Sequence, residues 1–165
     1  MSWLGPLVVA LHLSFGAPPE LEVMPVFHQG GVLVSGGDVT AGGLGGGLGV
    51  QLVVDRRWLT QADVGLLWLM GQAWLARVAV GVQRDAPWSP AGWLTLQTLW
   101  GDRVEHIGPD ALRPPIPTWG LGLRASLLRF GGASGVVSAL ELGVATDFAG
   151  GLWLEITLLQ AGARW

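Results

Sequence analysis

Large apolar side chains alternate with small or polar residues along one segment of this chain after another. In residues 44–52 (LGGGLGVQL), the leucines and the valine occupy even positions, whereas every odd position holds glycine or glutamine. Residues 58–70 and 73–83 repeat the alternation, with Asp63 and Arg77 on the glycine-bearing side. Successive side chains of a β-strand point to opposite faces of a sheet, so this period of two predicts β-structure.

Eight segments carry this alternation, some less cleanly than others, and they predict eight strands. They are residues 20–30, 43–54, 58–70, 73–83, 91–101, 118–130, 136–146 and 152–158. A competing interpretation takes residues 64–82 as one apolar membrane-spanning helix with a single arginine. The polar residues keep to one parity and glycine is too frequent for stable helices, so the strand interpretation is favoured.

The composition limits the environments in which these strands could lie. Half of the residues are hydrophobic, 13% are charged, and the mean hydropathy is +0.49. A soluble domain usually carries about 25% charged residues, so the shortage indicates a membrane or a very dry interior. The net charge of −3 leaves no basic patch for nucleic acid, and the absence of cysteine excludes disulfides and thiolate metal sites.

The second face of the predicted strands is small rather than fully polar. It consists mostly of glycine and alanine, with a few charged residues and glutamines. Such a face suits the cramped interior of a narrow closed barrel whose leucines and valines turn outward to lipid. We therefore predict an all-β fold, an eight-stranded antiparallel up-and-down transmembrane β-barrel. A soluble secreted β-barrel is the alternative at the level of the fold.

The tryptophans give an independent indication of lipid contact. With both termini on the periplasmic side, they fall near the two ends of the strands, the headgroup levels at which membrane barrels place aromatic side chains. The predicted aromatic girdle consists of Trp58, Trp68, Trp74, Trp93, Trp100, Trp119 and Trp165. The same orientation places the two longest loops, 31–42 and 101–117, on the outer side, as such barrels prefer.

The first residues have the layout of a secretory signal peptide. An apolar run from Trp3 to Phe15 ends at small residues, with Ser14 and Gly16 in positions suited to cleavage before Ala17. We therefore expect residues 1–16 to be a signal peptide and residues 17–165 to form the barrel.

Strand number, aromatic girdle, loop asymmetry and the terminal aromatic Trp165 together resemble the small eight-stranded outer-membrane β-barrel proteins of bacteria. The resemblance is architectural, and it implies a location in the outer membrane of a Gram-negative-type bacterium. In such proteins, alternating apolar residues lead to the last aromatic residue. Here the apolar residues of 152–158 are out of phase with Trp165, so we predict a bulge near Leu158–Leu159.

Charged residues on the inward-facing parity predict an interior charge network. Its expected members are Arg77, Arg124, Glu22, Asp63, Glu141 and Glu155. If residues 129 and 136 face each other across the turn, Arg124 lies directly opposite Glu141, and a three-residue turn at 147–149 would place Glu141 opposite Glu155 on the next strand. An unpaired charge in a dry interior would cost about 3–5 kcal/mol, so pairing is expected. Because the acids outnumber the arginines in this set, trapped water or a protonated carboxylate should balance the excess.

These features favour a non-enzymatic outer-membrane barrel that stabilises the envelope or presents loops 31–42 and 101–117 to a protein partner. The lipid bilayer is the expected surrounding, and we expect no catalytic residue, no cofactor, no metal and no nucleic acid. A narrow pore is the alternative, and recordings in lipid bilayers would distinguish it. A lipid-modifying enzyme is a third interpretation, since His28 and His106 remain in the mature chain, but no serine forms a recognisable motif with either. A catalytic Glu141–Glu155 pair is disfavoured by the narrow lumen.

Overall fold

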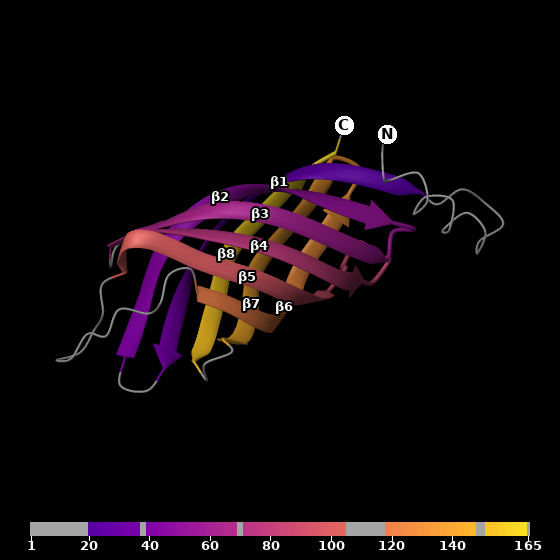
Figure 1. Ribbon diagram of the computed structural model, residues 1–165. Coiled ribbons are helices and arrows are strands. Elements are labelled where there is room, and N and C mark those ends of the chain that lie inside the picture. The colour runs from indigo at the N-terminus through magenta and orange to yellow at the C-terminus, as the bar shows by residue number, and fades with distance from the viewer. Residues whose placement is uncertain (1–19, 37–38, 69–70, 105–117, 148–150, 165) are drawn as a thin grey trace, which may run out of the picture.

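The computed structural model describes residues 20–36, 39–68, 71–104, 118–147 and 151–164. Eight antiparallel strands follow one another in chain order, and the last pairs with the first, which closes the sheet into a barrel (Figure 1). The all-β, eight-stranded antiparallel barrel is therefore confirmed. No helix among these residues is long and apolar enough to cross a membrane. The predicted signal peptide (residues 1–16), His106 and Trp165 lie outside the described residues.

The strands run from 11 to 16 residues in length. They are β1 (Leu21–Gly36), β2 (Val39–Val54), β3 (Trp58–Trp68), β4 (Gly71–Gln83), β5 (Ala91–Val104), β6 (Thr118–Gly132), β7 (Gly135–Asp147) and β8 (Leu152–Ala163). The helical interpretation of residues 64–82 is wrong, because this segment is divided between β3 and β4, which pair along their lengths. The described ends of the chain lie together at the end of the barrel that carries the β2–β3, β4–β5 and β6–β7 turns (Figure 1).

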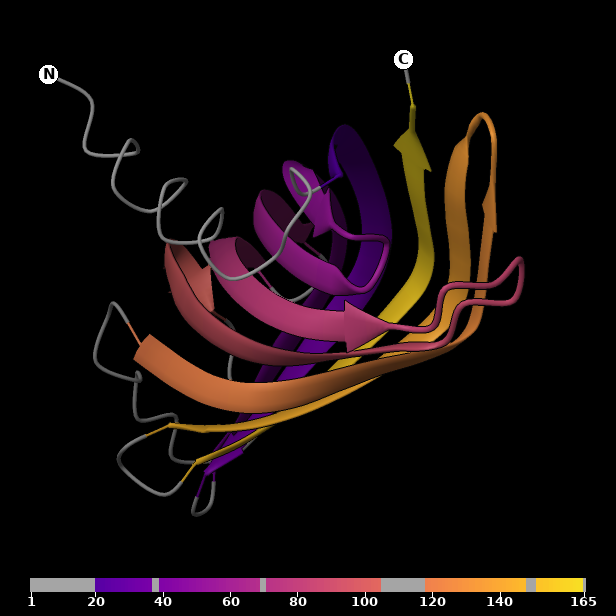
Figure 2. The same cartoon turned by 90° about the vertical axis from the view of Figure 1, so that its right-hand side faces the viewer.

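The turn between β4 and β5 is hydrogen-bonded to β6. Figure 2 shows that it extends beyond the neighbouring strands beside the β6–β7 hairpin. The Ser89 amide donates to the Arg129 carbonyl at 2.9 Å, and the Gly131 amide donates to the Pro87 carbonyl at 2.9 Å. These bonds satisfy backbone groups that a turn of this length would otherwise expose, and they attach it to β6.

The prediction of a long loop at residues 31–42 is wrong. Residues 31–36 continue β1, and residues 39–42 begin β2, so the two strands pair from Leu21↔Val54 to Gly36↔Val39. Gly30 permits a close approach of β1 to β8, because a Cβ on this residue would overlap the carbonyl oxygen of Ile156. The other predicted loop, 101–117, begins later than expected, since residues 101–104 belong to β5 and residues 105–117 lie outside the described part.

The inner and outer faces of the barrel differ sharply in character. The inward face of β3 shows the pattern, because Leu59 and Leu67 flank Gln61 and Asp63. One apolar cluster lies inside toward the turn end, with Met24, Val53, Leu59, Ala79, Ala91, Trp93 and Val136. A second lies toward the other end, with Val32, Leu67, Ala73, Leu75, Leu99, Ala145 and Trp153. The outer face carries exposed leucines and valines on every strand.

The predicted bulge in β8 is confirmed. The β1–β8 register shifts between Gln29, opposite Leu159, and Gly30, opposite Thr157, so Leu158 is the extra residue. Leu158 and Leu159 are both exposed, which changes the inward parity from Thr157 to Gln160. The same change occurs in β6 at Leu127 and Leu128, and in β7 between the buried residues Ser138 and Glu141. Three neighbouring strands therefore change parity together.

Leu140 lies where β7 changes parity, and its backbone is strained. Its φ angle is 57°, in the left-handed region that leucine seldom adopts. Replacing Leu140 with glycine should therefore cost less stability than replacing Leu142, which has the same outward orientation but no positive φ. Both changes delete the same side chain, while only the first relieves a conformation that costs about 1–2 kcal/mol. Urea unfolding, followed by tryptophan fluorescence, measures the difference, and equal losses would exclude strain at Leu140.

Candidate functional site

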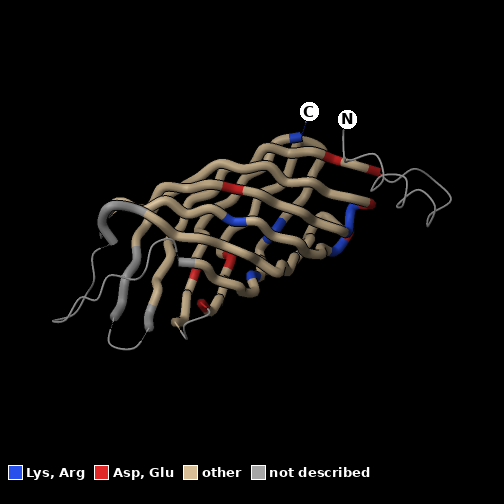
Figure 3. Tube along the Cα trace, in the orientation of Figure 1, with Lys and Arg blue, Asp and Glu red and all other residues tan. Residues whose placement is uncertain are grey.

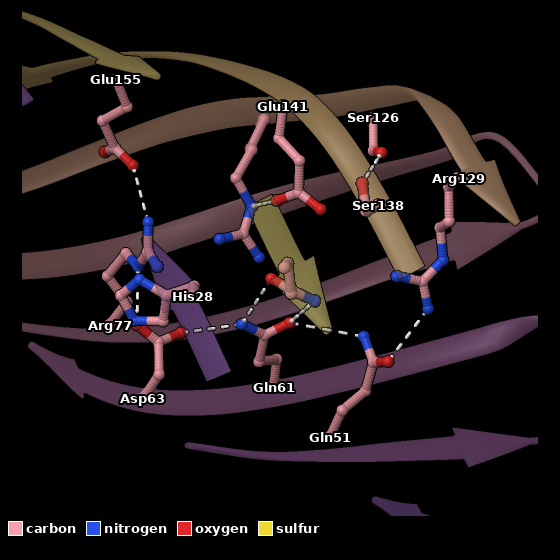
Figure 4. Close-up of polar contacts among 12 residues, drawn as sticks. His28, Gln51, Gln61, Asp63, Arg77, Ser126, Arg129, Ser138, Glu141 and Glu155 are labelled. Atoms are coloured by element: carbon pink, nitrogen blue, oxygen red, sulfur yellow. Dashed lines mark hydrogen bonds and ion pairs between the residues drawn. The ribbon is translucent and has the colours of Figure 1, made fainter. Parts of the chain in front are cut away.

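The polar interior of the barrel is the candidate site. Its buried polar and charged side chains are His28, Gln51, Gln61, Asp63, Arg77, Ser89, Thr95, Gln97, Arg124, Ser126, Arg129, Ser138, Glu141, Glu155, Thr157 and Gln160. They come from all eight strands and from the β4–β5 turn, and they lie between and beside the two apolar clusters. Figure 4 shows most of these side chains and the polar contacts among them.

Arg77 holds the centre of this site. Its Nε donates to Asp63 Oδ1 at 2.8 Å, and its Nη1 donates to Glu155 Oε2 at 3.1 Å (Figure 4). Asp63 is the direct cross-strand neighbour of Arg77, whereas Glu155 reaches it from β8. Strands β4 and β8 are four apart in a barrel of eight, so this second contact crosses the lumen. All three side chains are buried, a setting in which paired charges hold their partners firmly.

A row of glutamines extends the network toward the turn end. Gln61 Nε2 donates to Asp63 Oδ2 at 2.9 Å, and Gln51 Nε2 donates to Gln61 Oε1 at 3.3 Å. Arg129 Nη2 donates to Gln51 Oε1 at 2.9 Å, which again joins opposite strands, β6 and β2. Gln160 on β8 also bonds to Gln61. The hydrogen bonds therefore run without a break from Glu155 to Arg129 (Figure 4).

Arg124 lies inside, but its predicted register is wrong. Its cross-strand partner is Gly143, and the partner of Glu141 is Ser126, two residues away from the expected pairing. The cause is the turn, because β6 and β7 pair as far as Gly132↔Gly135. The ion pair survives as a diagonal contact, with Arg124 Nε 3.6 Å from Glu141 Oε2. The predicted pairing of Glu141 with Glu155 is also wrong, since Glu155 faces Gly143.

Trp93 points into the barrel, so its place in the predicted aromatic girdle is wrong. It is buried, and the Arg124 guanidinium carbon lies 4.7 Å from its ring centroid. The Arg129 guanidinium carbon lies 5.6 Å from the same ring. Its cross-strand neighbour Gly81 leaves room for the indole, because a Cβ there would come within 2.7 Å of Trp93 Cδ1. Cation–π contacts of this kind help to hold two arginines in a buried site.

The other described tryptophans of the predicted girdle lie on the outside. Trp58, Trp68, Trp74 and Trp119 are exposed, and Trp100, the ladder partner of Trp74, is half-buried on the same face. Trp58 begins β3 at the turn end, whereas the other four lie toward the opposite end of their strands. Trp88, in the β4–β5 turn, is exposed as well and donates to the Leu127 carbonyl at 2.7 Å.

Among the side chains that the structure describes, the interior charges balance, contrary to the expected excess of acid. Glu22 does not join the network, since it pairs with Arg164 at the turn end, where both side chains are partly exposed. Arg129 is an interior charge that the sequence analysis missed, because unbroken alternation along β6 would point this residue outward. The consecutive outward residues Leu127 and Leu128 change the parity of β6 and turn Arg129 inward. Arg77, Arg124 and Arg129 therefore face Asp63, Glu141 and Glu155, and no protonated carboxylate is required.

His28 contacts the acidic part of the network. Its Nε2 lies 3.1 Å from Asp63 Oδ1, close to Gly47 and Gly65. The Ser126 and Ser138 hydroxyls bond to each other, away from His28 in Figure 4, so neither forms a nucleophile pair with it. Within the described strands and turns, no group of three His, Cys, Asp or Glu side chains could hold a metal ion.

Most of the described charged residues outside the lumen lie at the end with the termini (Figure 3), whereas Asp147 lies at the opposite end of β7. Arg56 Nε donates to Glu20 Oε2 at 3.0 Å, and these bonds raise the pKa of the guanidinium because the carboxylate favours its charged form. Arg57 and Arg84 occupy the turns at the same end and are exposed. The outer faces of the strands between the two ends remain almost uncharged.

The fold and the site define a class of protein: a closed eight-stranded barrel with an apolar outside and a charge-paired, filled inside. Comparison with known proteins adds no narrower assignment, because no protein-family model matches the chain and a search of the curated proteins finds no match.

Proposed function

We propose that this chain is a transmembrane β-barrel of the outer membrane of a Gram-negative-type bacterium and that it acts without catalysis. The outer face carries the proposal. More large hydrophobic side chains are exposed than buried, and they cover all eight strands. Soluble monomers rarely expose contiguous apolar patches above a few hundred Å². An apolar outer surface around a charged interior suits lipid, which argues against the soluble secreted alternative.

The dimensions of the barrel fit this location. A membrane-spanning strand needs about 9–11 residues, and the shortest strand here has 11. Exposed tryptophans lie toward both ends of the outer face, with Trp58 at the turn end and Trp68, Trp74 and Trp119 toward the other. This is the placement expected of side chains at the two headgroup levels.

The interior favours a structural role over a pore. Side chains of opposite strands touch twice across the lumen, through Arg77 with Glu155 and through Arg129 with Gln51. Apolar clusters fill the space toward both ends. An eight-stranded barrel has an interior that side chains can fill, so such cross-lumen contacts support a filled interior over an open pore.

The same contacts argue against an enzyme. The carboxylates of Asp63 and Glu155 are bound to Arg77, and His28 faces Asp63 rather than a hydroxyl. These groups are buried, so a lipid substrate in the outer leaflet would not reach them. We therefore assign the network to stability. The barrel would reinforce the envelope or present the long β1–β2 hairpin and residues 105–117 to a protein partner on the outer side.

Membrane extraction tests the proposal. The chain should remain in the outer-membrane fraction after carbonate washing, and an unboiled sample should migrate faster on an SDS gel than a boiled one. Leu123→Arg should reduce the inserted fraction roughly tenfold or more, since an arginine facing lipid costs about 2–4 kcal/mol at the midplane. A matched change at the water-exposed turn, Ala133→Arg, should have little effect. Recovery of the chain in the soluble fraction would refute the membrane location.

A further inference from the structure

Two cavities adjoin each other on the outer surface near the turn end. The larger, of about 890 Å³, crosses β3 to β7 and is lined almost entirely by apolar side chains, among them Trp58, Leu94 and Leu123. The smaller, of about 550 Å³, lies at the β2–β3 and β4–β5 turns. Trp58, Val82 and Gly92 line both, so the two form one groove that leads from the turns onto the outer face.

Small outward residues create the apolar part of the groove. Gly92 and Ala125 are cross-strand neighbours on the outer face, next to the larger outward pair Leu94 and Leu123. A Cβ on Gly92 would have only the Arg124 carbonyl oxygen within 4 Å, at 3.9 Å. This glycine therefore leaves open space instead of permitting a close backbone contact. The hollow is apolar and extends across five strands, which suits an acyl chain.

The mouth of the groove is basic. Arg57 and Arg84 line the smaller cavity, and neither forms an ion pair with any described residue. Their neighbour Arg56 differs, because it is paired with Glu20. Arg84 lies over the ring of Trp88, with its guanidinium carbon 5.9 Å from the centroid. Asp85 is adjacent in the sequence but does not line the cavity.

We propose that this groove binds one anionic phospholipid, with its phosphate at Arg57 and Arg84 and an acyl chain along Gly92 and Ala125. Guanidinium groups bind phosphate through charge-assisted hydrogen bonds, and their fork geometry suits it. The two arginines stand beside exposed Trp58 and Trp88, at the level where we place the headgroups. This inference rests on the proposed membrane location, and it adds a ligand class that the location alone does not require.

Native mass spectrometry of the full chain, released from nanodiscs, tests the headgroup contact. The probes are phosphatidylglycerol and phosphatidylcholine with identical acyl chains. The wild-type barrel should retain phosphatidylglycerol roughly tenfold more than phosphatidylcholine. Arg57→Gln with Arg84→Gln should reduce this preference to less than about twofold, while the matched control Arg56→Gln should keep it. Equal retention of both lipids by the wild type, or an equal loss in the control, would overturn the proposal.

A second variant tests the acyl-chain contact. Gly92→Leu should fill the groove without backbone overlap and lower phosphatidylglycerol retention by roughly fivefold, with both arginines in place. Inorganic phosphate at millimolar concentration should not displace the lipid. Unchanged retention in Gly92→Leu, or displacement by phosphate, would overturn a lipid site in favour of a bare anion site. A chain that enters nanodiscs without lipid preference refutes this inference alone, whereas a chain that never enters them refutes the proposed function as well.

Discussion

Replacing Arg77 with leucine should lower the free energy of unfolding by about 3–5 kcal/mol. The guanidinium bonds to Asp63 at 2.8 Å and to Glu155 at 3.1 Å, and all three side chains are buried. Without it, two carboxylates on opposite strands lose their shared cation in a space with little water. Asp63 keeps its contacts to His28 and Gln61, but Glu155 keeps no cation. Urea titration in detergent micelles, read from the heat-modifiable gel band, measures the loss.

An exposed arginine supplies the control for this variant. Arg56→Leu removes an ion pair of similar length, yet both side chains are exposed and solvent screens them, so the free energy of unfolding should hardly change. Adding Asp63→Asn and Glu155→Gln to Arg77→Leu should restore part of the stability, because no buried charge then lacks a partner. Equal effects at Arg77 and Arg56 would show that the interior is wet enough to screen its charges.

Replacing Gly45 with valine should prevent folding or cost more than about 3 kcal/mol. A Cβ on this residue would overlap the Leu66 carbonyl oxygen and come within 2.9 Å of the Leu67 Cα, so the backbones of β2 and β3 would have to separate. Overpacking costs about 1–3 kcal/mol when side chains can yield, and backbone atoms in a closed barrel yield less. The fraction that refolds into micelles, counted on unboiled gels, measures the effect.

Gly92→Val is the matched control for Gly45→Val. Both replace a strand glycine with the same β-branched residue, but the Gly92 Cβ would enter open space. Refolding of Gly92→Val should therefore match the wild type. If both variants refold equally well, β2 and β3 do not approach each other as closely as the described geometry requires.

Side-chain parity predicted most of the fold and much of the site. Where a strand is regular, as in β3, every inward residue has the expected direction, and Asp63 and Arg77 meet as cross-strand neighbours. The bulge in β8 was also predictable, because the parity of 152–158 conflicts with a terminal aromatic residue. Alternation is local and follows directly from strand geometry, so it needs no knowledge of the neighbouring strands.

The parts that depend on other strands could not be predicted in this way. The register of Arg124 and Glu141 depends on the residues at which the β6–β7 turn closes. Alternation gives the direction of each side chain but not the position of the turn. Arg129 points inward only because β6 changes parity together with β7 and β8. Trp93 is different, because alternation with the outward Leu94 and Leu96 already indicates an inward direction; its position near a strand end suggested the girdle instead.

Nitroxide labels on the outer face test most directly whether the leucines and valines touch lipid. The chain has no cysteine, so Val64→Cys and Val144→Cys give single labels on two strands, and Ala133→Cys gives a matched label in the β6–β7 turn. In lipid bilayers, labels at residues 64 and 144 should collide more often with oxygen than with a polar nickel complex, and the label at 133 should show the reverse. Strand labels that meet the nickel complex as often as the turn label does would contradict the account.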